Sequence, residues 1–167
     1  MPVTSRSVRT RLTRALQDSS PDLLRYFMRR LEREDAADAL AEVMATAWAR
    51  VDSLPLELNE ARMWLFGIAR NTVLHAIRGN VRRAKLASRL QNVLSQSPAP
   101  PADLGVEIRD AINRLDFELA ELIRLVHWDG FSLAEAAKIL NLPASTARGR
   151  YQRARAALRE MLAPVKG

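Results

Sequence analysis

The chain has 167 residues, 48% hydrophobic and 27% charged, with a net charge of +7, so it is neither a disordered tail nor a membrane protein. No apolar run approaches the roughly 20 residues that span a bilayer, and the basic start lacks the apolar core of a secretory signal, so we expect a cytoplasmic protein without membrane insertion. It has no cysteine and only two distant histidines, which excludes disulfides, thiolate chemistry and zinc fingers; we expect no metal and no cofactor.

Positive charge is distributed unevenly along the chain. Of the 26 basic residues, 23 are arginine. Residues 1–30, 61–102 and 143–167 carry net charges of +5, +7 and +5, whereas 31–60 and 103–142 carry −6 and −4. Basic blocks separated by acidic ones predict two contacts with a polyanion and leave the acidic surfaces for another partner. Arginine's planar fork suits phosphates and guanine edges.

Helical periodicity extends through nearly the whole sequence, and no segment alternates like a strand. The first helix is predicted to begin at residues 19–22, Ser-Ser-Pro-Asp, which leaves residues 1–20 as an N-terminal extension. Further helices are expected at about 35–51 and 60–78, with a Pro55-containing loop between them. Trp48 and Trp64 are predicted to be core residues. If the third helix continues past Gly79-Asn80, its basic residues share one face.

The composition changes at residues 95–102, Ser-Gln-Ser-Pro-Ala-Pro-Pro-Ala, which have little to bury and cannot form a helix. We therefore predict an all-α fold of two small helical bundles, at 21–90 and 105–163, joined by a flexible Pro/Ser-rich linker at 91–104. Each bundle is small, so each core is expected to be thin.

The second half is predicted to contain a helix-turn-helix. Helices are expected at about 105–115, 117–128, 132–140 and 144–162, and Ser132 with Glu135 fits a capping box. A short turn, residues 141–143, then leads into a helix with an arginine face. Such a helix would enter the major groove, with its early residues at base edges and its later arginines on phosphates. The alternative is an ordinary helical hairpin with a solvated basic face.

The third helix mixes aromatic, basic and amide side chains. Asn71 lies in mid-helix, where asparagine is unfavourable because it competes for backbone hydrogen bonds. Together with Trp64 and the neighbouring arginines, it predicts a helix that could hold unstacked single-stranded bases. A polar surface residue is an equally good interpretation of Asn71, and His75 is expected to be a surface residue and not a ligand.

Two stretches resemble a known family. Residues 35–44, Ala47-Trp48 and the run Trp-Leu-Phe-Gly-Ile-Ala-Arg-Asn at 64–71 look like region 2 of the extracytoplasmic-function (ECF) subgroup of sigma-70-type initiation factors. Residues 131–137, 145–151 and 153–155 look like region 4 of the same subgroup. The two resemblances occur in the family's order, with a proline-rich segment between them.

The resemblance implies roles for three sets of residues. An acidic set would dock on the β′ coiled coil of core RNA polymerase: Asp35, Asp38 and Glu42. A second set would read and melt the −10 promoter element, near a flipped base of the non-template strand: Leu58, Arg62, Trp64, Arg70, Asn71 and Arg78. A third would read the −35 element as duplex: Ser145, Thr146, Arg148, Arg150, Gln152, Arg153 and Arg155. The implied partners are core polymerase through its β′ coiled coil and β flap, promoter DNA, and an anti-sigma factor.

Two other classes of function fit the sequence less well. A stand-alone helix-turn-helix regulator would need a dimerisation surface, and the sequence offers no sustained heptad seam. An enzyme would need more than the carboxylates of Asp35, Asp38 and Glu42, which lack a histidine, a cysteine or a phosphate-binding glycine loop nearby. A solvated or docking face explains these carboxylates better, so the chain is expected not to be an enzyme.

Overall fold

The computed structural model describes residues 4–91 and 104–164, and the side chains of these except 81, 83–91 and 104. The chain divides into two compact units, Met1–Leu94 and Ser95–Gly167. Within the described ranges every regular element is a helix, which confirms the predicted all-α class with two helical domains. The Pro/Ser segment 95–102 lies outside the described residues.

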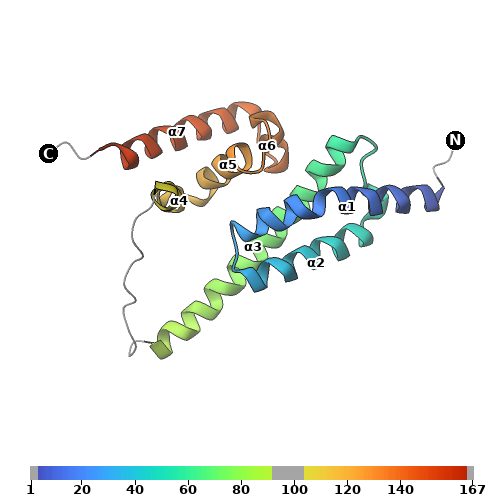
Figure 1. Cartoon of the computed structure of the whole chain (residues 1–167), viewed down its shortest axis with the longest axis horizontal. Helices are drawn as coiled ribbons and strands as arrows, with labels where there is room; N and C mark the ends of the chain where they lie inside the picture. The colour runs from blue at the N-terminus through green and yellow to red at the C-terminus, as the bar shows by residue number, and fades with distance from the viewer. Residues whose placement is uncertain (1–3, 92–103, 165–167) are drawn as a thin grey trace. The chain divides into compact units, whose positions relative to one another are not determined.

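Unit 1 is built from α1 (Ser5–Met28), α2 (Arg33–Ala49), the short 3₁₀ helix η1 (Val51–Ser53) and the long α3 (Leu58–Gln91). The three α-helices all pack against one another (Figure 1). An aromatic cluster fills the centre, where the ring of Tyr26 meets the rings of Phe27 and Phe66 edge-on at 5.4 and 5.3 Å. All three side chains are fully buried, so this cluster holds the first and third helices together.

The first helix begins much earlier than predicted. The expected start at residues 19–22 is wrong, because α1 runs without interruption from Ser5 and contains Pro21. Pro21 lies on the exposed side of α1, and proline inside a helix costs roughly 3 kcal/mol because it lacks the N–H that bonds to the preceding turn. On the opposite side Leu12 and Leu16 are buried, and their burial extends the helix toward the N-terminus.

The predictions for the tryptophans and for the length of α3 have opposite outcomes. The prediction that Trp48 is a core residue is wrong, because its side chain is 41% exposed. The buried side of α2 is formed by smaller residues at helical spacing: Ala36, Ala39, Val43 and Ala47. Trp64, also predicted to be a core residue, is only half-buried. By contrast, α3 does continue through Gly79-Asn80 as far as Gln91.

Unit 2 contains α4 (Leu104–Arg114), α5 (Phe117–His127), α6 (Leu133–Ile139) and α7 (Ala144–Leu162), close to the predicted bounds. Its core joins three helices around buried Ile112, Ile123 and Ala154. The predicted capping box is present: the Glu135 backbone N–H donates to Ser132 Oγ at 3.1 Å, and the Ser132 N–H donates to Glu135 Oε1 at 3.0 Å. These bonds fix the start of the helix-turn-helix.

The turn between α6 and α7 depends on one unusual backbone conformation. Asn141 has φ of 54°, in the left-handed region that asparagine tolerates better than most residues. The backbone N–H groups of Asn141 and Leu142 donate to the carbonyls of Lys138 and Ala137 at 3.1 and 2.8 Å. This closes α6 and allows α7 to start within three residues.

We expect Ser132→Ala to destabilise unit 2 by about 1 kcal/mol, because the N-cap hydroxyl is lost. In a domain of this size that lowers the unfolding midpoint by roughly 4–8 °C, measured by calorimetry on the full chain. Ser132→Asp is the matched control, since aspartate also caps. Equal midpoints for Ser132→Ala and the parent would show that the box contributes nothing.

Candidate nucleic-acid interface

One side of α3 carries a stripe of polar and aromatic side chains. Trp64, Asn71 and Arg78 are seven residues apart and therefore lie along one face of the helix. Asn71 and Arg78 are exposed, and so is His75 between them. Leu65, Phe66, Ala69 and Val73 are buried on the other side of α3, where α3 packs against the first two helices. Along the helix, the stripe therefore presents the indole of Trp64, the amide of Asn71, the imidazole of His75 and the guanidinium of Arg78.

Three of the predicted −10 residues lie off this stripe. Arg62 faces α1, with its Nη2 3.5 Å from Asp22 Oδ2 and its guanidinium 5.0 Å from the centre of the Phe66 ring. Arg70 is half-buried, and its Nε is buried without a hydrogen-bond partner among the described residues. Leu58, at the first turn of α3, is 76% exposed. The predicted −10 residues thus lie in three places. Trp64, Asn71 and Arg78 form the stripe, Arg62 and Arg70 pack against other helices, and Leu58 lies at the end of the loop before α3.

The exposed side of α7 brings together four of the seven predicted −35 residues. Ser145, Arg148, Gln152 and Arg155 are spaced at i, i+3, i+7 and i+10, so they form one stripe, and all four are exposed. Arg159 continues this stripe and is also exposed. No acidic residue occurs between Leu140 and Arg159. This stripe presents donors at the spacing that a major groove accepts.

The other three residues, Thr146, Arg150 and Arg153, lie on a different side of α7. Arg150 Nη1 is 2.7 Å from Glu118 Oε2 on α5, and the arginine side chain is only 24% exposed. A guanidinium held this way braces the recognition helix against its own domain. Thr146 is half-buried and Arg153 exposed, so of these three only Arg153 projects freely into solvent.

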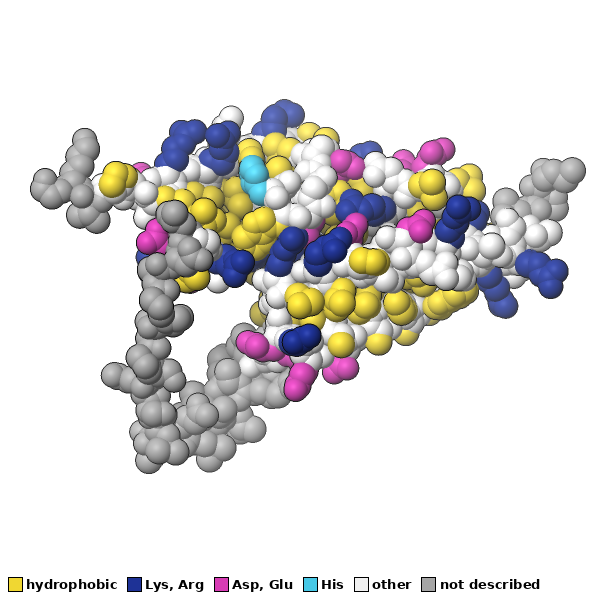
Figure 2. Space-filling model, viewed as in Figure 1, with side chains coloured by type: hydrophobic (Ala, Val, Ile, Leu, Met, Phe, Trp, Pro, Cys, Tyr) yellow, Lys and Arg dark blue, Asp and Glu magenta, His cyan; other side chains and the backbone are white. Residues whose placement is uncertain are grey.

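The exposed side of α2 combines small apolar residues with acids. Ala37, Ala41 and Ala45 are exposed, and Trp48, three residues after Ala45, extends their row and is 41% exposed. Figure 2 shows hydrophobic side chains on the surface of unit 1. Asp38 and Glu42 flank the row and are exposed, whereas Asp35 is half-buried and accepts from Asn80 Nδ2 at 3.5 Å. A flat row of alanines with acids beside it can receive a basic helix closely.

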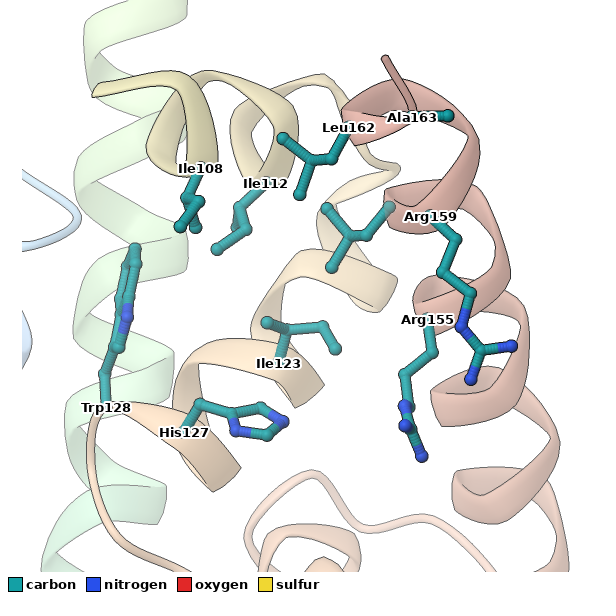
Figure 3. Close-up of a pocket in the computed structure, with 10 residues that line it drawn as sticks. Ile108, Ile112, Ile123, His127, Trp128, Arg155, Arg159, Leu162 and Ala163 are labelled. Carbon is teal, nitrogen blue, oxygen red and sulfur yellow. The ribbon is translucent and has the colours of Figure 1, made fainter. Parts of the chain in front are cut away.

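An apolar groove of about 610 Å³ lies between α4, α5 and α7 in unit 2. Figure 3 shows Ile108 and Ile112 on one wall and Arg155 and Arg159 on the other. His127 lines the same groove, and its Nε2 is 2.7 Å from the hydroxyl of Tyr151. The apolar floor and basic rim fit an amphipathic segment that carries acidic residues.

The family resemblance also places the loop 54–60 near the flipped base, and in that loop Leu56 is 73% exposed. Sequence reasoning missed two other residues of these surfaces. The periodicity of α3 could have placed His75 on the Trp64–Asn71–Arg78 stripe. Glu118 had no sequence signal, because it lies 32 positions from its partner, Arg150. In the described ranges no three His, Asp or Glu side chains gather as a metal site would need, and no helix there could cross a membrane.

Comparison with known proteins identifies the family of this chain. The family descriptions "Sigma-70 region 2" and "Sigma-70, region 4" match residues 16–83 and 105–158. The ECF RNA polymerase sigma factor EcfG of Rhodopseudomonas palustris is 31% identical over 158 residues, covering 90% of this chain and 87% of EcfG. SigL of Mycobacterium tuberculosis, also an ECF sigma factor, is 28% identical over 154 residues, covering 89% of this chain and 87% of SigL.

A solved structure supports the same assignment. The sigma factor RpoE of Bartonella quintana, in complex with the anti-sigma factor NepR, matches with a TM-score of 0.66 and 27% identity, covering 95% of this chain and 98% of RpoE. The matched regions occur in the order region 2, then region 4, one in each compact unit. The chain therefore belongs to the ECF RNA polymerase sigma factors of the sigma-70 family, which are transcription initiation factors and not enzymes.

Proposed function

We propose that this chain binds core RNA polymerase and directs it to promoters by reading the −35 element as duplex with α7 and opening the −10 element with α3. The observation that carries this proposal is the difference between the two exposed stripes. The α7 stripe is hydroxyl, amide and guanidinium without an aromatic ring, whereas the α3 stripe adds an indole and an imidazole. Duplex is read by hydrogen bonds at base edges, and unstacked bases are held by rings.

The duplex half of the proposal depends on Arg148 and Gln152. Arginine pairs bidentately with guanine and glutamine with adenine in the major groove. Both side chains are exposed on α7, after a turn of helix-turn-helix geometry. Arg153, Arg155 and Arg159 would contact the phosphates beside these bases, while Arg150, paired with Glu118 at 2.7 Å, supports the helix.

The single-strand half depends on the α3 stripe and the loop before it. Trp64 can stack on an unpaired base, Asn71 can hydrogen-bond to a base edge, and Arg78 can neutralise a phosphate. Leu58 is almost fully exposed at the loop end, where it could occupy the space that a flipped base vacates. Arg62 and Arg70 are packed against the helices and would stabilise the stripe from behind.

Protein partners would occupy the remaining surfaces. The alanine row of α2, flanked by Asp38 and Glu42, would receive the β′ coiled coil of core polymerase, with Asp35 aiding through its contact to α3. The groove of unit 2 would receive the β flap. An anti-sigma factor, as in the RpoE–NepR complex, would compete for these same surfaces and hold the protein in the cytoplasm or at the inner membrane.

The test of the proposed function is transcription in vitro with purified bacterial core polymerase and a plasmid library of randomised upstream sequences. We expect transcripts only when the chain is added, from templates that share an upstream and a downstream motif. A stand-alone regulator would instead bind duplex from the library without core polymerase. Transcription that does not depend on the chain would overturn the proposal.

We expect Asn71→Ala to leave closed-complex formation nearly intact and to reduce promoter opening, because its partner is a base already out of the stack and unstacking costs a few kcal/mol that the pocket must offset. Permanganate footprinting of the −10 region with polymerase present measures this. A pre-melted template should rescue the defect. Lys138→Ala, an exposed change on α6, is the control. Normal opening by Asn71→Ala would exclude the single-strand role of this helix.

A further inference from the structure

We propose that the first turns of α1 and the loop at residues 54–58 form one DNA-contacting surface, in which Arg11 positions the loop and Arg14 contacts a phosphate of the opened strand. This rests on the proposed function, which has the loop facing the −10 element. The match to sigma-70 region 2 begins only at residue 16, so these turns lie outside it.

The loop combines a buried anchor with exposed leucines. Leu54 is 8% exposed, whereas Leu56 and Leu58 are 73% and 76% exposed. Two large apolar side chains projecting from one short loop are available to a ligand that brings its own apolar surface, such as the face of an unstacked base. For the leucines to act as a fixed edge, the backbone between Leu54 and Leu58 has to be held in place.

Arg11 supplies that restraint. Its Nη2 donates to the carbonyl oxygen of Pro55 at 2.5 Å, across 44 positions of sequence. Pro55 stands between the anchor and the first exposed leucine, where a fixed carbonyl sets the direction of the chain that follows. A hydrogen bond from a charged donor is stronger than one between neutral groups, so Arg11 is well suited to restrain a solvent-facing loop.

The helix that carries Arg11 is itself fixed. Leu12, the next residue, is fully buried, and Ala15 and Leu16 follow it into the core of unit 1. The helix also contacts η1, the element directly before the loop. The backbone that carries Arg11 is therefore held by the core of unit 1, and the hydrogen bond from Arg11 links the loop to that core.

The same turns carry positive charge without compensation. Residues 4–17 contain four arginines and no acidic residue. Arg6, Arg9 and Arg14 are exposed. Arg14 follows Arg11 by three residues, so it lies on the same side of the helix, about 4.5 Å along the axis at 1.5 Å per residue. An exposed arginine beside a base-holding loop is placed to bind a phosphate of the strand.

The first experiment uses Arg11→Met, which keeps an unbranched side chain and removes the donor. In holoenzyme at a promoter recovered from the library, we expect promoter opening, read by permanganate, to fall about fivefold or more. Affinity for core polymerase, binding to the upstream duplex and the unfolding midpoint should be unchanged, which separates positioning from a loss of fold. Arg11→Lys, which retains a charged donor, should restore at least half of the opening.

The second experiment measures salt dependence. Arg14→Ala should reduce the slope of log affinity against log salt for the open promoter complex by about 0.7, the contribution of one single-strand phosphate contact. Arg25→Ala is the charge-matched control on the same helix: Arg25 is an exposed partner of Asp22, about 17 Å along the axis from Arg14 at 1.5 Å per residue, and should leave the slope unchanged.

Leu58→Ala distinguishes failure of this inference from failure of the proposed function. If Leu58→Ala impairs opening while Arg11→Met opens like the parent, the loop acts at the promoter but Arg11 does not position it, and the inference is wrong. If both variants open normally, the proposed role of the loop itself is wrong. An unchanged salt slope for Arg14→Ala would overturn the phosphate contact.

Discussion

Phe66→Ala is expected to destabilise unit 1 by about 3–5 kcal/mol, the usual cost of removing a buried aromatic side chain. Phe66 is fully buried, and its ring meets that of Tyr26 edge-on at 5.3 Å, so the deletion opens a cavity where α1 and α3 meet. Domains of this size have a total stability of only about 5–15 kcal/mol. The unfolding midpoint of unit 1 should therefore fall by about 15 °C or more.

Unit 2 should be unaffected by Phe66→Ala, and fluorescence can test this. In a Trp48→Phe/Trp64→Phe background Trp128 is the remaining tryptophan, and it packs on the core of unit 2. The unfolding midpoint of unit 2, followed by the fluorescence of Trp128, should be the same with and without Phe66→Ala. Phe117→Ala is the matched control, because Phe117 is 37% exposed and its loss should cost less than about 1 kcal/mol. A common transition for both units would contradict independent folding.

Arg148→Ala is expected to weaken binding of the holoenzyme to its upstream duplex element by about 1–3 kcal/mol, because a bidentate contact to a base edge is lost. That corresponds to roughly 5- to 150-fold in affinity. The loss should be concentrated at one base position, where the variant no longer distinguishes the preferred base. Binding to duplexes with each base substituted in turn measures this.

Arg150→Ala provides the control for Arg148→Ala, since it removes the same charge from the same helix. Its guanidinium is 2.7 Å from the carboxylate of Glu118, so we expect little change in base preference. Glu118→Gln should behave like Arg150→Ala if the pair only braces the helix. Equal, sequence-independent losses for Arg148→Ala and Arg150→Ala would show that both arginines contact phosphates and that neither reads a base.

The fold was largely predictable because its helices have local signals. In unit 2 the capping residues Ser132 and Glu135 and the turn at Asn141 mark the ends of α6 in the sequence itself. In unit 1 the same reasoning failed at residues 19–22, where a serine–proline start signal was outweighed by burial of Leu12 and Leu16 on the far side of α1. Tertiary packing therefore overrode the local start signal, as it commonly overrides local propensity.

The candidate site was less predictable, because long-range pairs decide which arginines are free. Helical spacing is enough to group Arg148 with Gln152. It gives no sign that Asp22 approaches Arg62 from 40 positions away or that Glu118 pairs with Arg150. These partners occupy side chains that would otherwise be taken as DNA contacts. The roles in polymerase and promoter binding stay predictions until the variants are measured.

The left-handed backbone of Asn141 has a consequence for how promoter preference can evolve. This residue sets the direction in which α7 leaves α6, although its own side chain has no proposed contact with DNA. A change in the side chains of α7 exchanges one preferred base for another and leaves the rest of the motif readable. A change at Asn141 would reorient every recognition side chain of α7 together and lower affinity for all sequences alike. New promoter preferences can therefore evolve by substitutions on the surface of α7, but not by substitutions at Asn141.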